Sequence, residues 1–462
     1  MTNPAMIRPG VLPPLDEEFL PLVLVNHQFQ NQTRSLGEPL VIGLERSANE
    51  ISRYETSLFP ESHPLAGTNL PYVERLVKFL LWQRGAFRVY IGGPRKIGDA
   101  IARIYSLSGE RRFDVDFLGR QVYEQPFQVV VCQPEQVPSA HEEGQHLGRH
   151  IIGNRIGFDL GASDRKVSAV IDGRVIYSEE VKWEPRVQTN PQYFYDEISR
   201  ALKTAASKLP SLDAIGGSSA GIYINNRPMV ASLFRSVSEE RFAEVKSLFQ
   251  RLGNDFSVPL NVINDGDVTA LAGSMSVGEN GLLGVALGSS EAAGYVDVNG
   301  RITGWLNELC FAPIDCNPAA PRDEWSGDQG CGASYFSQQC VFRLASKACI
   351  AIPSGLLDAE KLELVQLKLE AGDEGATKIW QSMGVYLGYG LALYADFYDL
   401  RHVLILGRCT SGRGGNLLLE GVQKVFETDF PELLGRFSIH LPDEKTRRIG
   451  QSVAAASLPV IC

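Results

Sequence analysis

The stretch Arg155-Ile-Gly-Phe-Asp-Leu-Gly-Ala-Ser-Asp-Arg-Lys-Val-Ser-Ala-Val-Ile-Asp-Gly-Arg-Val-Ile-Tyr-Ser178 predicts three consecutive β-strands. Apolar residues alternate on either side of a turn made of Gly161, Ala162 and Ser163, and an Asp-Gly pair marks a second hairpin. Backbone N–H groups of such a small turn can approach an anion, and Asp159 at its edge could hold a metal ion or water near phosphate. The same pattern also fits an ordinary hairpin with an acidic edge.

Two other predicted strands end in polar residues that could face a ligand. The segment Pro259–Gly273 is a buried-type strand that ends at Asn264 and Asp265 and continues into a helix of small residues. An earlier strand ends at Ser218 and Ser219, whose hydroxyls could contact a ligand. Asn and Asp are also favoured helix caps, so the pair could simply open the helix. The two serines likewise fit a plain change from strand to loop.

Two later turns are also rich in small residues. One lies in a second strand–turn–strand unit and contains Gly288, Ser289 and Ser290. The other follows a late apolar strand and contains Gly407 and Gly412, before a predicted helix. Both turns could admit phosphate or a nucleotide base to the backbone, although a flexible surface loop has the same composition.

The first third of the chain carries separate α/β signals. Residues 1–38 read as an arm with one strand in Leu20–Val25, and residues 134–149 read as a polar linker. Between them the expected strands are Leu40–Leu44, Phe87–Ile91 and Phe127–Val131, and the expected helices are Tyr72–Trp82 and Lys96–Tyr105. The rhythm of Leu40–Ser47 is similar to that of Ile156–Ser163, so this third could be a decayed copy of a later lobe. Chance similarity explains the likeness equally simply.

Composition narrows the class of protein. The 462 residues are 44% hydrophobic and 21% charged, which is typical of a soluble globular chain with two or three domains. The net charge of −10 disfavours nonspecific nucleic-acid binding, which requires Lys and Arg. No apolar run approaches the ~20 residues of a membrane span, and residues 1–14 lack the pattern of a secretory signal. Eight cysteines without a C-x-x-C pair favour reduced thiols and a cytoplasmic protein.

The order of these segments resembles the sugar kinase, hexokinase and actin fold, and more narrowly the ROK family of repressors, open reading frames and sugar kinases. Asp159–Ser163 is similar to that family's Asp-x-Gly-Gly-Thr phosphate turn. Asn264-Asp265 is similar to its Asn-Asp pair, and Asn307–Leu309 to its Gly-Glu-Ile-Gly-His segment. The resemblance runs from about Arg155 to the C-terminus.

This resemblance implies an α/β chain with a two-lobe, actin-like ATPase (ribonuclease H-like) sugar kinase fold and an additional N-terminal α/β region. The implied division is an arm at 1–38, an α/β extension and linker at 39–150, a first lobe at 151–275, a second lobe at 276–444, and a helix at 445–462 that packs back on the first lobe.

The resemblance also implies ATP-dependent phosphorylation of a sugar hydroxyl, with ATP and Mg²⁺ as cofactors. Asp265 would be the catalytic base, and Asn264, Glu308, Ser218 and Ser219 would bind the sugar. Asp159 would hold Mg²⁺ through water. The implied phosphate and nucleotide contacts are Asp159, Gly161, Ala162, Ser163, Gly288, Ser289, Ser290, Gly407 and Gly412. The implied partners are a sugar and a nucleotide, without nucleic acid or membrane, and the chain could form a homodimer.

The zinc motif of the family is largely absent. The family holds zinc with one His and three Cys, whereas here Phe311 stands for the His, and Glu324 and Ser326 stand for two of the Cys. Only Cys331 remains, and one thiolate cannot hold a structural zinc ion, so we expect none. A second sugar-binding Glu of the family is replaced by Ala333.

These departures keep three functions open. The first is a carbohydrate kinase with altered substrate contacts. The second is a kinase-fold sugar or nucleotide sensor without catalysis, favoured by the lost zinc ligands and by Glu291, which would repel a triphosphate from the second phosphate turn. The third is a structural scaffold. A DNA-binding repressor is disfavoured, because residues 39–150 lack a basic helix–turn–helix pattern.

Overall fold

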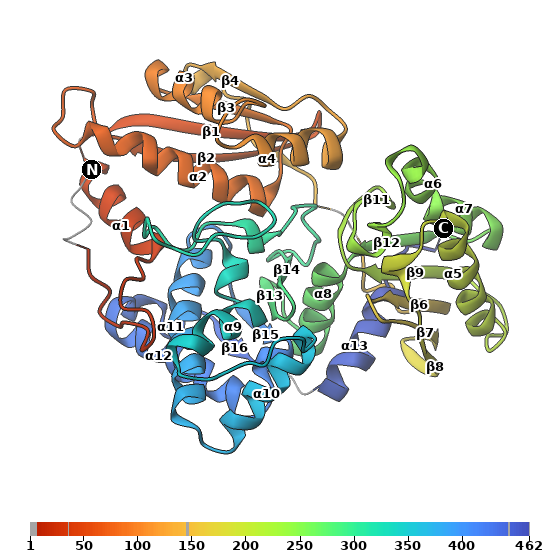
Figure 1. The fold of residues 1–462 in the computed structure, drawn as a ribbon. Helices are drawn as coiled ribbons and strands as arrows, with labels where there is room; N and C mark the ends of the chain where they lie inside the picture. The colour runs from red at the N-terminus through yellow and green to blue at the C-terminus, as the bar shows by residue number, and fades with distance from the viewer. Residues whose placement is uncertain (1–6, 36, 145–146, 442–443, 462) are drawn as a thin grey trace.

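The computed structural model describes residues 7–35, 37–144, 147–441 and 444–461, without the side chains of 444–449. The chain forms an N-terminal domain, a first lobe (lobe 1) and a second lobe (lobe 2). The N-terminal domain lies across the top of lobe 2, and lobe 1 stands beside both (Figure 1). Over the described ranges, no helix has both the length and the apolar character that crossing a membrane would require.

The N-terminal domain is a five-stranded sheet of order β4-β3-β1-β2-β5 covered by helices. Its strands are β1 (Glu38–Ser47), β2 (Glu50–Leu58), β3 (Arg88–Gly92), β4 (Gln128–Cys132) and β5 (His141–Glu142). Its helices are α1 (Leu22–Thr33), α2 (Asn69–Arg84), α3 (Arg95–Ile104) and α4 (Arg112–Asp116), followed by the short helix η3 (Phe117–Tyr123). The region that read partly as a linker therefore contributes an edge strand, β5, which pairs with β2.

The strand predicted in Leu20–Val25 is wrong, because helix α1 begins at Leu22. The buried residues Leu22, Asn26, Phe29 and Thr33 are spaced by three or four positions, so one helical face is covered by the rest of the domain. Packing of that face outweighs the strand preference of the Leu and Val residues, whose local sequence alone favoured an extended chain.

The N-terminal domain is not a copy of either lobe. Its β3 pairs with β1 in the antiparallel direction, whereas the corresponding central pairs of the two lobes run parallel. Strand direction is fixed by how the chain connects, and it does not decay with sequence divergence. The similarity between Leu40–Ser47 and Ile156–Ser163 is therefore a coincidence of strand–glycine units.

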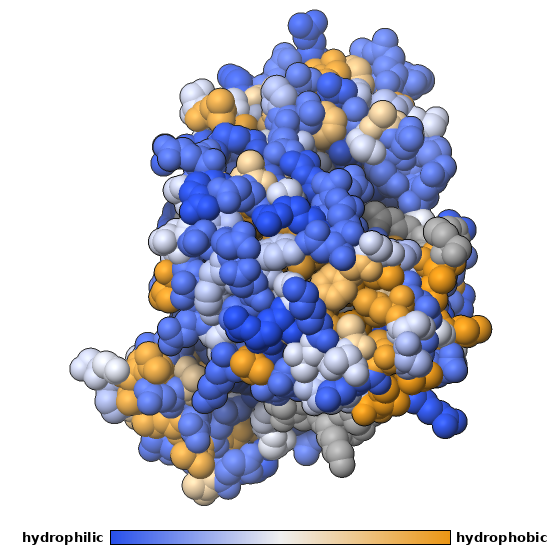
Figure 2. Space-filling model, turned by 90° about the vertical axis from the view of Figure 1, so that its right-hand side faces the viewer, coloured by the Kyte–Doolittle hydropathy of each residue, from blue (hydrophilic) through white to orange (hydrophobic). Residues whose placement is uncertain are grey.

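Lobe 1 is built on a five-stranded sheet of order β12-β9-β6-β7-β8. The strands are β6 (Asn154–Leu160), β7 (Asp164–Ile171), β8 (Arg174–Lys182), β9 (Ala214–Ser219) and β12 (Leu260–Asn264), with a small hairpin of β10 (Ile222–Ile224) and β11 (Arg227–Val230). The helices are α5 (Pro191–Ala206), α6 (Phe242–Lys246) and α7 (Leu248–Phe256). Viewed from this lobe's side, hydrophilic residues predominate over the N-terminal domain at the top, and hydrophobic ones gather below, over lobe 1 (Figure 2).

Lobe 2 combines a four-stranded sheet of order β14-β13-β15-β16 with a large helical layer. The strands are β13 (Leu282–Leu287), β14 (Glu291–Val296), β15 (His402–Leu406) and β16 (Ser438–His440). The helices are α9 (Gln338–Lys347), α10 (Asp358–Glu370), α11 (Glu374–Ala395) and α12 (Arg413–Asp429). Between β14 and α9 lies an insert without long helices or strands, residues 297–337, which faces the N-terminal domain.

Two helices join the lobes. Helix α8 (Asp265–Val277) leaves the lobe 1 sheet at its N-terminus and packs on β13 and β14 of lobe 2. Helix α13 (Glu444–Ala456) returns from lobe 2 to the lobe 1 sheet. A Cβ atom at Gly216 would lie 1.7 Å from the carbonyl oxygen of Ala455, so glycine is required there for the helix backbone to lie directly on the strands.

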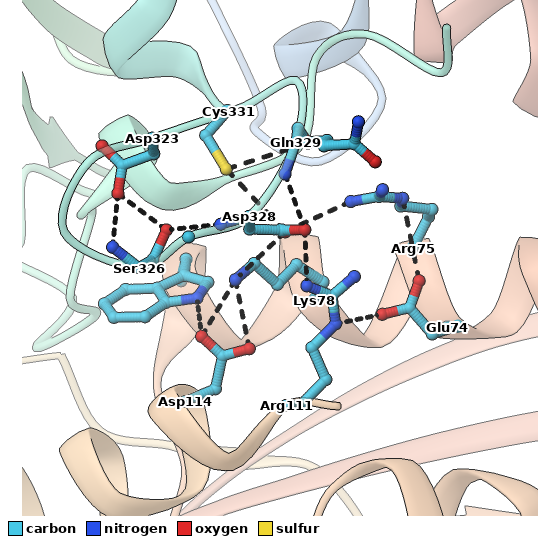
Figure 3. Close-up of polar contacts among 12 residues, drawn as sticks. Glu74, Arg75, Lys78, Arg111, Asp114, Asp323, Ser326, Asp328, Gln329 and Cys331 are labelled. Carbon is cyan, nitrogen blue, oxygen red and sulfur yellow. Dashed lines mark hydrogen bonds and ion pairs between the residues drawn. The ribbon is translucent and has the colours of Figure 1, made fainter. Parts of the chain in front are cut away.

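A buried ion-pair cluster ties helix α2 to the insert of lobe 2 (Figure 3). Asp328 of the insert forms ion pairs with Arg111 Nη1 at 2.6 Å, Arg75 Nη1 at 3.2 Å and Lys78 Nζ at 3.3 Å. These cations hold the pKa of the Asp328 carboxyl well below its usual range despite the opposing effect of burial. Lys78 has no exposed surface and also donates to Asp114 at 2.9 Å, so the cluster is nearly free of solvent screening.

We expect Lys78→Met to destabilise the protein by about 3–5 kcal/mol, because Asp114 would remain as a buried charge with only the Trp82 indole N–H as a donor. Adding Asp114→Leu should recover part of that loss. The measurement is urea unfolding followed by circular dichroism. Lys96→Met is the matched control: Lys96 and Glu61 form an exposed pair, and its removal should leave the midpoint unchanged. Equal shifts in Lys78→Met and Lys96→Met would show that the cluster adds nothing.

Candidate functional site

Three adjacent parallel strands of lobe 1 bring polar residues to one edge of the sheet. Asp159 near the end of β6 is directly opposite Ser218 of β9, and Ser219 is opposite Asn264 at the end of β12. The Ser218 hydroxyl donates to Asp159 Oδ1 at 2.8 Å. Carboxyl ends of parallel strands are the usual place for ligands in α/β sheets. The first phosphate turn and the Asn-Asp pair, far apart in sequence, thus lie on the two sides of β9.

Asn264 caps helix α8, and Asp265 is the first residue inside it. The Asn264 side chain accepts from the Gly266 N–H at 2.6 Å and donates to the Gly221 carbonyl at 2.8 Å. The capping role that sequence alone allowed for Asp265 is therefore taken by Asn264. Asp265 Oδ1 accepts from the Gly266 N–H at 3.1 Å, and among the described residues only backbone N–H groups donate to this carboxylate, which leaves it open to another partner.

Gly266 and Gly294 allow the N-terminus of α8 to pack closely against strand β14 of lobe 2. A Cβ atom at Gly294 of β14 would lie 2.1 Å from the carbonyl carbon of Gly266, so side chains at this crossing would force the helix away. Asp265 consequently lies at the boundary of the two lobes. The segment that carries Glu308 reaches the same boundary from lobe 2, because the side-chain amide of the preceding residue, Asn307, donates to Asp267 Oδ1 of α8 at 3.2 Å.

Helix α2 of the N-terminal domain positions Glu308. The backbone N–H of Glu308 donates to the Trp82 carbonyl at 3.0 Å, and that of Asn307 donates to the Gln83 carbonyl at 2.9 Å. Two of the orphan carbonyls at the end of α2 are thereby satisfied by the segment that resembles the family's sugar-binding motif.

The carboxyl groups at the boundary all have raised pKa values. Burial, followed by the charge of Asp159, raises the pKa of Asp265 to about 6. Burial and then the charge of Asp265 raise the pKa of Glu308 to about 7. Burial raises the pKa of Asp267 to about 7, although Tyr295 N–H and the Asn307 amide donate to it. Burial also raises the pKa of Asp159, against the lowering effect of Lys166. Strongly perturbed carboxyl groups gathered at a domain boundary are characteristic of functional sites.

The first phosphate turn has its outer residues free of side-chain packing. Ala162 and Ser163 are exposed, and the Gly161 N–H donates to the Asp164 carbonyl at 2.9 Å. The carbonyl of Gly161 accepts from the Trp183 indole at 2.8 Å, which fixes the base of the turn. The turn is thus held in shape while its tip remains open.

The second phosphate turn and the glycine loop lie together. Ser289 and Ser290 are exposed, and the Gly288 carbonyl accepts from the Gln338 N–H at 2.9 Å. Gly407 has φ 104°, and a Cβ atom there would lie 2.4 Å from the Leu287 carbonyl, so only glycine fits beside the turn. Gly412 has φ 60° and lies against the carboxylate of Glu370, which accepts from the Arg413 N–H at 2.8 Å.

Two expectations change when the side chains are placed. Ser219 is fully buried and its hydroxyl accepts from Tyr223 at 2.7 Å, so it points away from the Asp159 side and we omit it from the proposed ligand contacts. Glu291 does not face the phosphate turn, contrary to the repulsion expected from sequence. It is 2% exposed, accepts from Tyr394 at 2.7 Å, and burial raises its pKa to about 8.

Sequence reasoning missed Lys166, whose Nζ lies 3.7 Å from Asp159 and 3.1 Å from Asp164. Pairing the strands across the Gly161–Ser163 turn sets Lys166 opposite Asp159, so the hairpin register contained this signal. It also missed the N-terminal domain's approach to Asn264. A cavity of about 170 Å³ there is bordered by the β1–β2 turn, by lobe 1 and by lobe 2.

The positions of the zinc motif are filled by other contacts. Phe311 packs against Trp82 of α2, with ring centroids 4.3 Å apart, and Cys331 lies buried beside Asp328. Within the described ranges, no group of three or more His, Cys, Asp or Glu side chains is arranged to hold a metal ion. The insert is thus attached to α2 by rings and ion pairs.

Comparison with known proteins gives structural matches only. No protein-family model matches the sequence, and no curated protein matches it. A ROK family glucokinase from Streptomyces griseus, solved with glucose and AMPPNP, matches 66% of this chain and 99% of its own, at 20% identity and a TM-score of 0.50. A ROK hexokinase from Thermus thermophilus matches 66% of this chain and 98% of its own, at 17% identity and a TM-score of 0.51.

A ROK family transcriptional regulator, a homologue of the E. coli MLC protein, matches equally well. It covers 66% of this chain and 78% of its own, at 18% identity and a TM-score of 0.51. Two thirds of this chain have the fold of the ROK proteins. The expected two-lobe, actin-like ATPase fold is thereby confirmed. The ROK fold is shared by kinases and by a regulator, so activity has to be argued from the site.

The raised pKa of Asp265 makes stability depend on pH. The folded state holds this proton to higher pH than the unfolded chain, so unfolding releases protons between about pH 4 and the folded value of about 6, and stability falls as pH rises through that window. We expect Asp265→Asn to lose less stability than the parent protein between pH 4 and pH 7. Urea midpoints at the two values would measure this, with the exposed Glu135→Gln as control. A loss equal to that of the parent protein would contradict the raised pKa.

Proposed function

We propose that the chain is a divergent ROK-type kinase that transfers the γ-phosphoryl group of ATP to a hydroxyl of a sugar. The observation that carries the proposal is the placement of Asn264 and Asp265 beside Asp159 at one sheet edge, with the segment of Glu308 joined to the same helix from lobe 2 through the Asn307–Asp267 hydrogen bond. The match to a ROK glucokinase solved with glucose and AMPPNP supports the assignment of a sugar and a nucleotide to this boundary.

Asp265 is proposed as the base. Its pKa of about 6 leaves it largely ionised at neutral pH, yet close enough to accept a proton during transfer. The sugar hydroxyl oxygen forms a bond to the γ-phosphorus, its proton passes to Asp265, and the bond to the β-phosphate oxygen breaks. Asn264 would orient the sugar, and Glu308 and Ser218 would accept or donate hydrogen bonds to its other hydroxyls.

The turns at Gly161–Ser163 and Gly288–Ser290 are proposed to contact the phosphates, and the loop at Gly407 and Gly412 the nucleotide. The carboxylate of Asp159 fits a Mg²⁺ ion held through water, because magnesium in phosphoryl-transfer sites uses one or two carboxylates. Mg²⁺ would neutralise the charge that develops on the phosphates. Lys166 contributes a fixed positive charge at the same carboxylate.

A second candidate function is sugar or nucleotide binding without catalysis. Two observations favour it. Lys166 already pairs with Asp159, which reduces the pull of that carboxylate on a metal ion. Glu370 lies at the N-terminus of α12, where its charge disfavours an approaching phosphate. Activity measurements separate the two functions.

We expect Asp265→Asn to lower turnover by ~10²-fold or more while nucleotide binding is retained, because a positioned acid–base group contributes about that much. The assay is ADP release with a panel of hexoses and amino sugars. Asp267→Asn is the matched control: this carboxyl lies on the same helix but accepts from Asn307 and the Tyr295 N–H, so its loss should change stability far more than turnover. Unchanged turnover in Asp265→Asn would remove the base from the mechanism.

A bound sugar should tighten Mg-ATP binding, because both ligands would lie at the boundary of the two lobes. If the lobes close around the first ligand, the second ligand binds to lobes that are already closed. By reciprocity, Mg-ATP should tighten sugar binding by the same factor. Calorimetric titration of Mg-ATP with and without each sugar measures this, and titration of ATP without Mg²⁺ is the control. If nucleotide binds under no condition, the kinase proposal fails and sugar binding without catalysis replaces it.

A further inference from the structure

A second cavity, of about 930 Å³, lies between the N-terminal domain and lobe 1, apart from the carboxyl groups of the proposed kinase site. Its walls come from three parts of the molecule: η3 of the N-terminal domain, the segment from β11 to α6 of lobe 1, and Trp325 from the insert of lobe 2. Its volume is in the range of small-molecule sites, and its place between domains is a usual one for them.

The cavity has an apolar floor and an uncovered aromatic ring. Met229, Phe234 and Val237 are buried residues of lobe 1 that line it. Trp325 is 62% exposed, although its ring is held edge-on against Phe311 at 5.4 Å and Phe117 at 5.8 Å. A Trp ring that is fixed by neighbours and still open to solvent offers a flat platform, and one end of it can hydrogen-bond.

The charged residues around the cavity are mostly basic. Arg120, Arg227, Arg235 and Lys246 contribute four positive charges, whereas Glu124 and Glu239 contribute two negative ones. Arg227 and Lys246 share Glu124, and Arg120 pairs both with Glu239 and with Asp116 of α4. Arg235 forms no ion pair with any residue that the structure describes. In a chain of net charge −10, this basic lining favours an anion over a neutral ligand.

We propose that this cavity binds an anionic saccharide, with a sugar ring on Trp325 and its carboxylate or phosphate group on Arg235. A ring with C–H groups on one face suits the flat indole, and a guanidinium can form paired hydrogen bonds with either anion. The site is separate from the proposed kinase site. A ligand there would touch all three parts of the molecule and so favour one arrangement of lobe 1 relative to the rest.

Trp325 provides a direct reading of this site. Of the five tryptophans, Trp82, Trp183 and Trp380 are buried and Trp305 is partly buried beside Asn264, so Trp325 has the most exposed indole, and a Trp325→Phe variant identifies its share of the emission. The probes are glucose 6-phosphate, glucuronate, glucose and inorganic phosphate, titrated without nucleotide and checked by calorimetry. We expect at least one of the two anionic sugars to quench the emission, and at least about ten-fold weaker binding of glucose and of phosphate. Which anionic sugar binds identifies the anion.

Three variants make the test decisive. Arg235→Glu should weaken binding of the anionic sugar by at least about ten-fold. Arg436→Glu makes the same charge change at an exposed arginine of lobe 2 and should leave that binding unchanged. Asp265→Asn should bind the anionic sugar as tightly as the parent protein does, because Asp265 does not line this cavity. This result would distinguish the cavity from the proposed kinase site. Equal binding of glucose and its phosphate, or an Arg235→Glu variant that binds normally, would overturn the proposal.

Discussion

The attachment of helix α2 to the insert of lobe 2 governs the geometry of the candidate site. A single carboxylate, Asp328, receives three cations, and one of them, Lys78, has no contact with solvent. Buried charges of this kind are held in place because moving any one of them would leave its partner as an unpaired charge in the protein interior, which is strongly destabilising. The same helix ends in carbonyls that hold the backbone of Glu308. One helix outside the two lobes therefore fixes the backbone of Glu308.

This arrangement gives a physical account of the missing zinc ligands. A metal ion joins the parts of an irregular segment through short bonds and makes them one rigid unit. In this chain the insert gains comparable restraint from outside itself, through the Phe311 ring on Trp82 and the cations on Asp328. The first third of the chain thus restrains the insert from outside the two lobes.

The sequence predicted those features that local patterns determine. The strand–small turn–strand units, the Asn264–Asp265 pair and the helices that follow Asp265 and Gly412 were predicted from residue spacing within short windows, and the order of the motifs indicated the fold. Helix α1 was missed because burial by distant residues decided it. The contact between Arg75 and Asp328 spans 253 positions, and nothing within either segment signals the other. Lys166 is the exception: its pairing with Asp159 was readable from the hairpin register and was overlooked.

The charges around Asp328 and those around Asp265 differ in whether they are paired. Around Asp328 the buried carboxylates and cations pair with one another, and this pairing favours one fixed structure. Around Asp265 the charge of Asp159 opposes ionisation of Asp265, the charge of Asp265 opposes ionisation of Glu308, and Lys166 offsets part of the negative charge at Asp159. Such a site is less stable alone than with positive charge or hydroxyl groups added, which is the trade between stability and activity seen at functional sites.

The return of α13 to the lobe 1 sheet has a consequence during synthesis. Arg155, in the first strand of that lobe, is buried and donates to the carbonyls of Ala456 and Pro459, 301 and 304 positions later. At 5–20 residues per second, the ribosome needs roughly 15 to 60 s to make the intervening chain. For that time the sheet face around Gly157 and Gly216 has no α13 backbone to cover it, so the first lobe cannot complete its native packing until the end of the chain has been made.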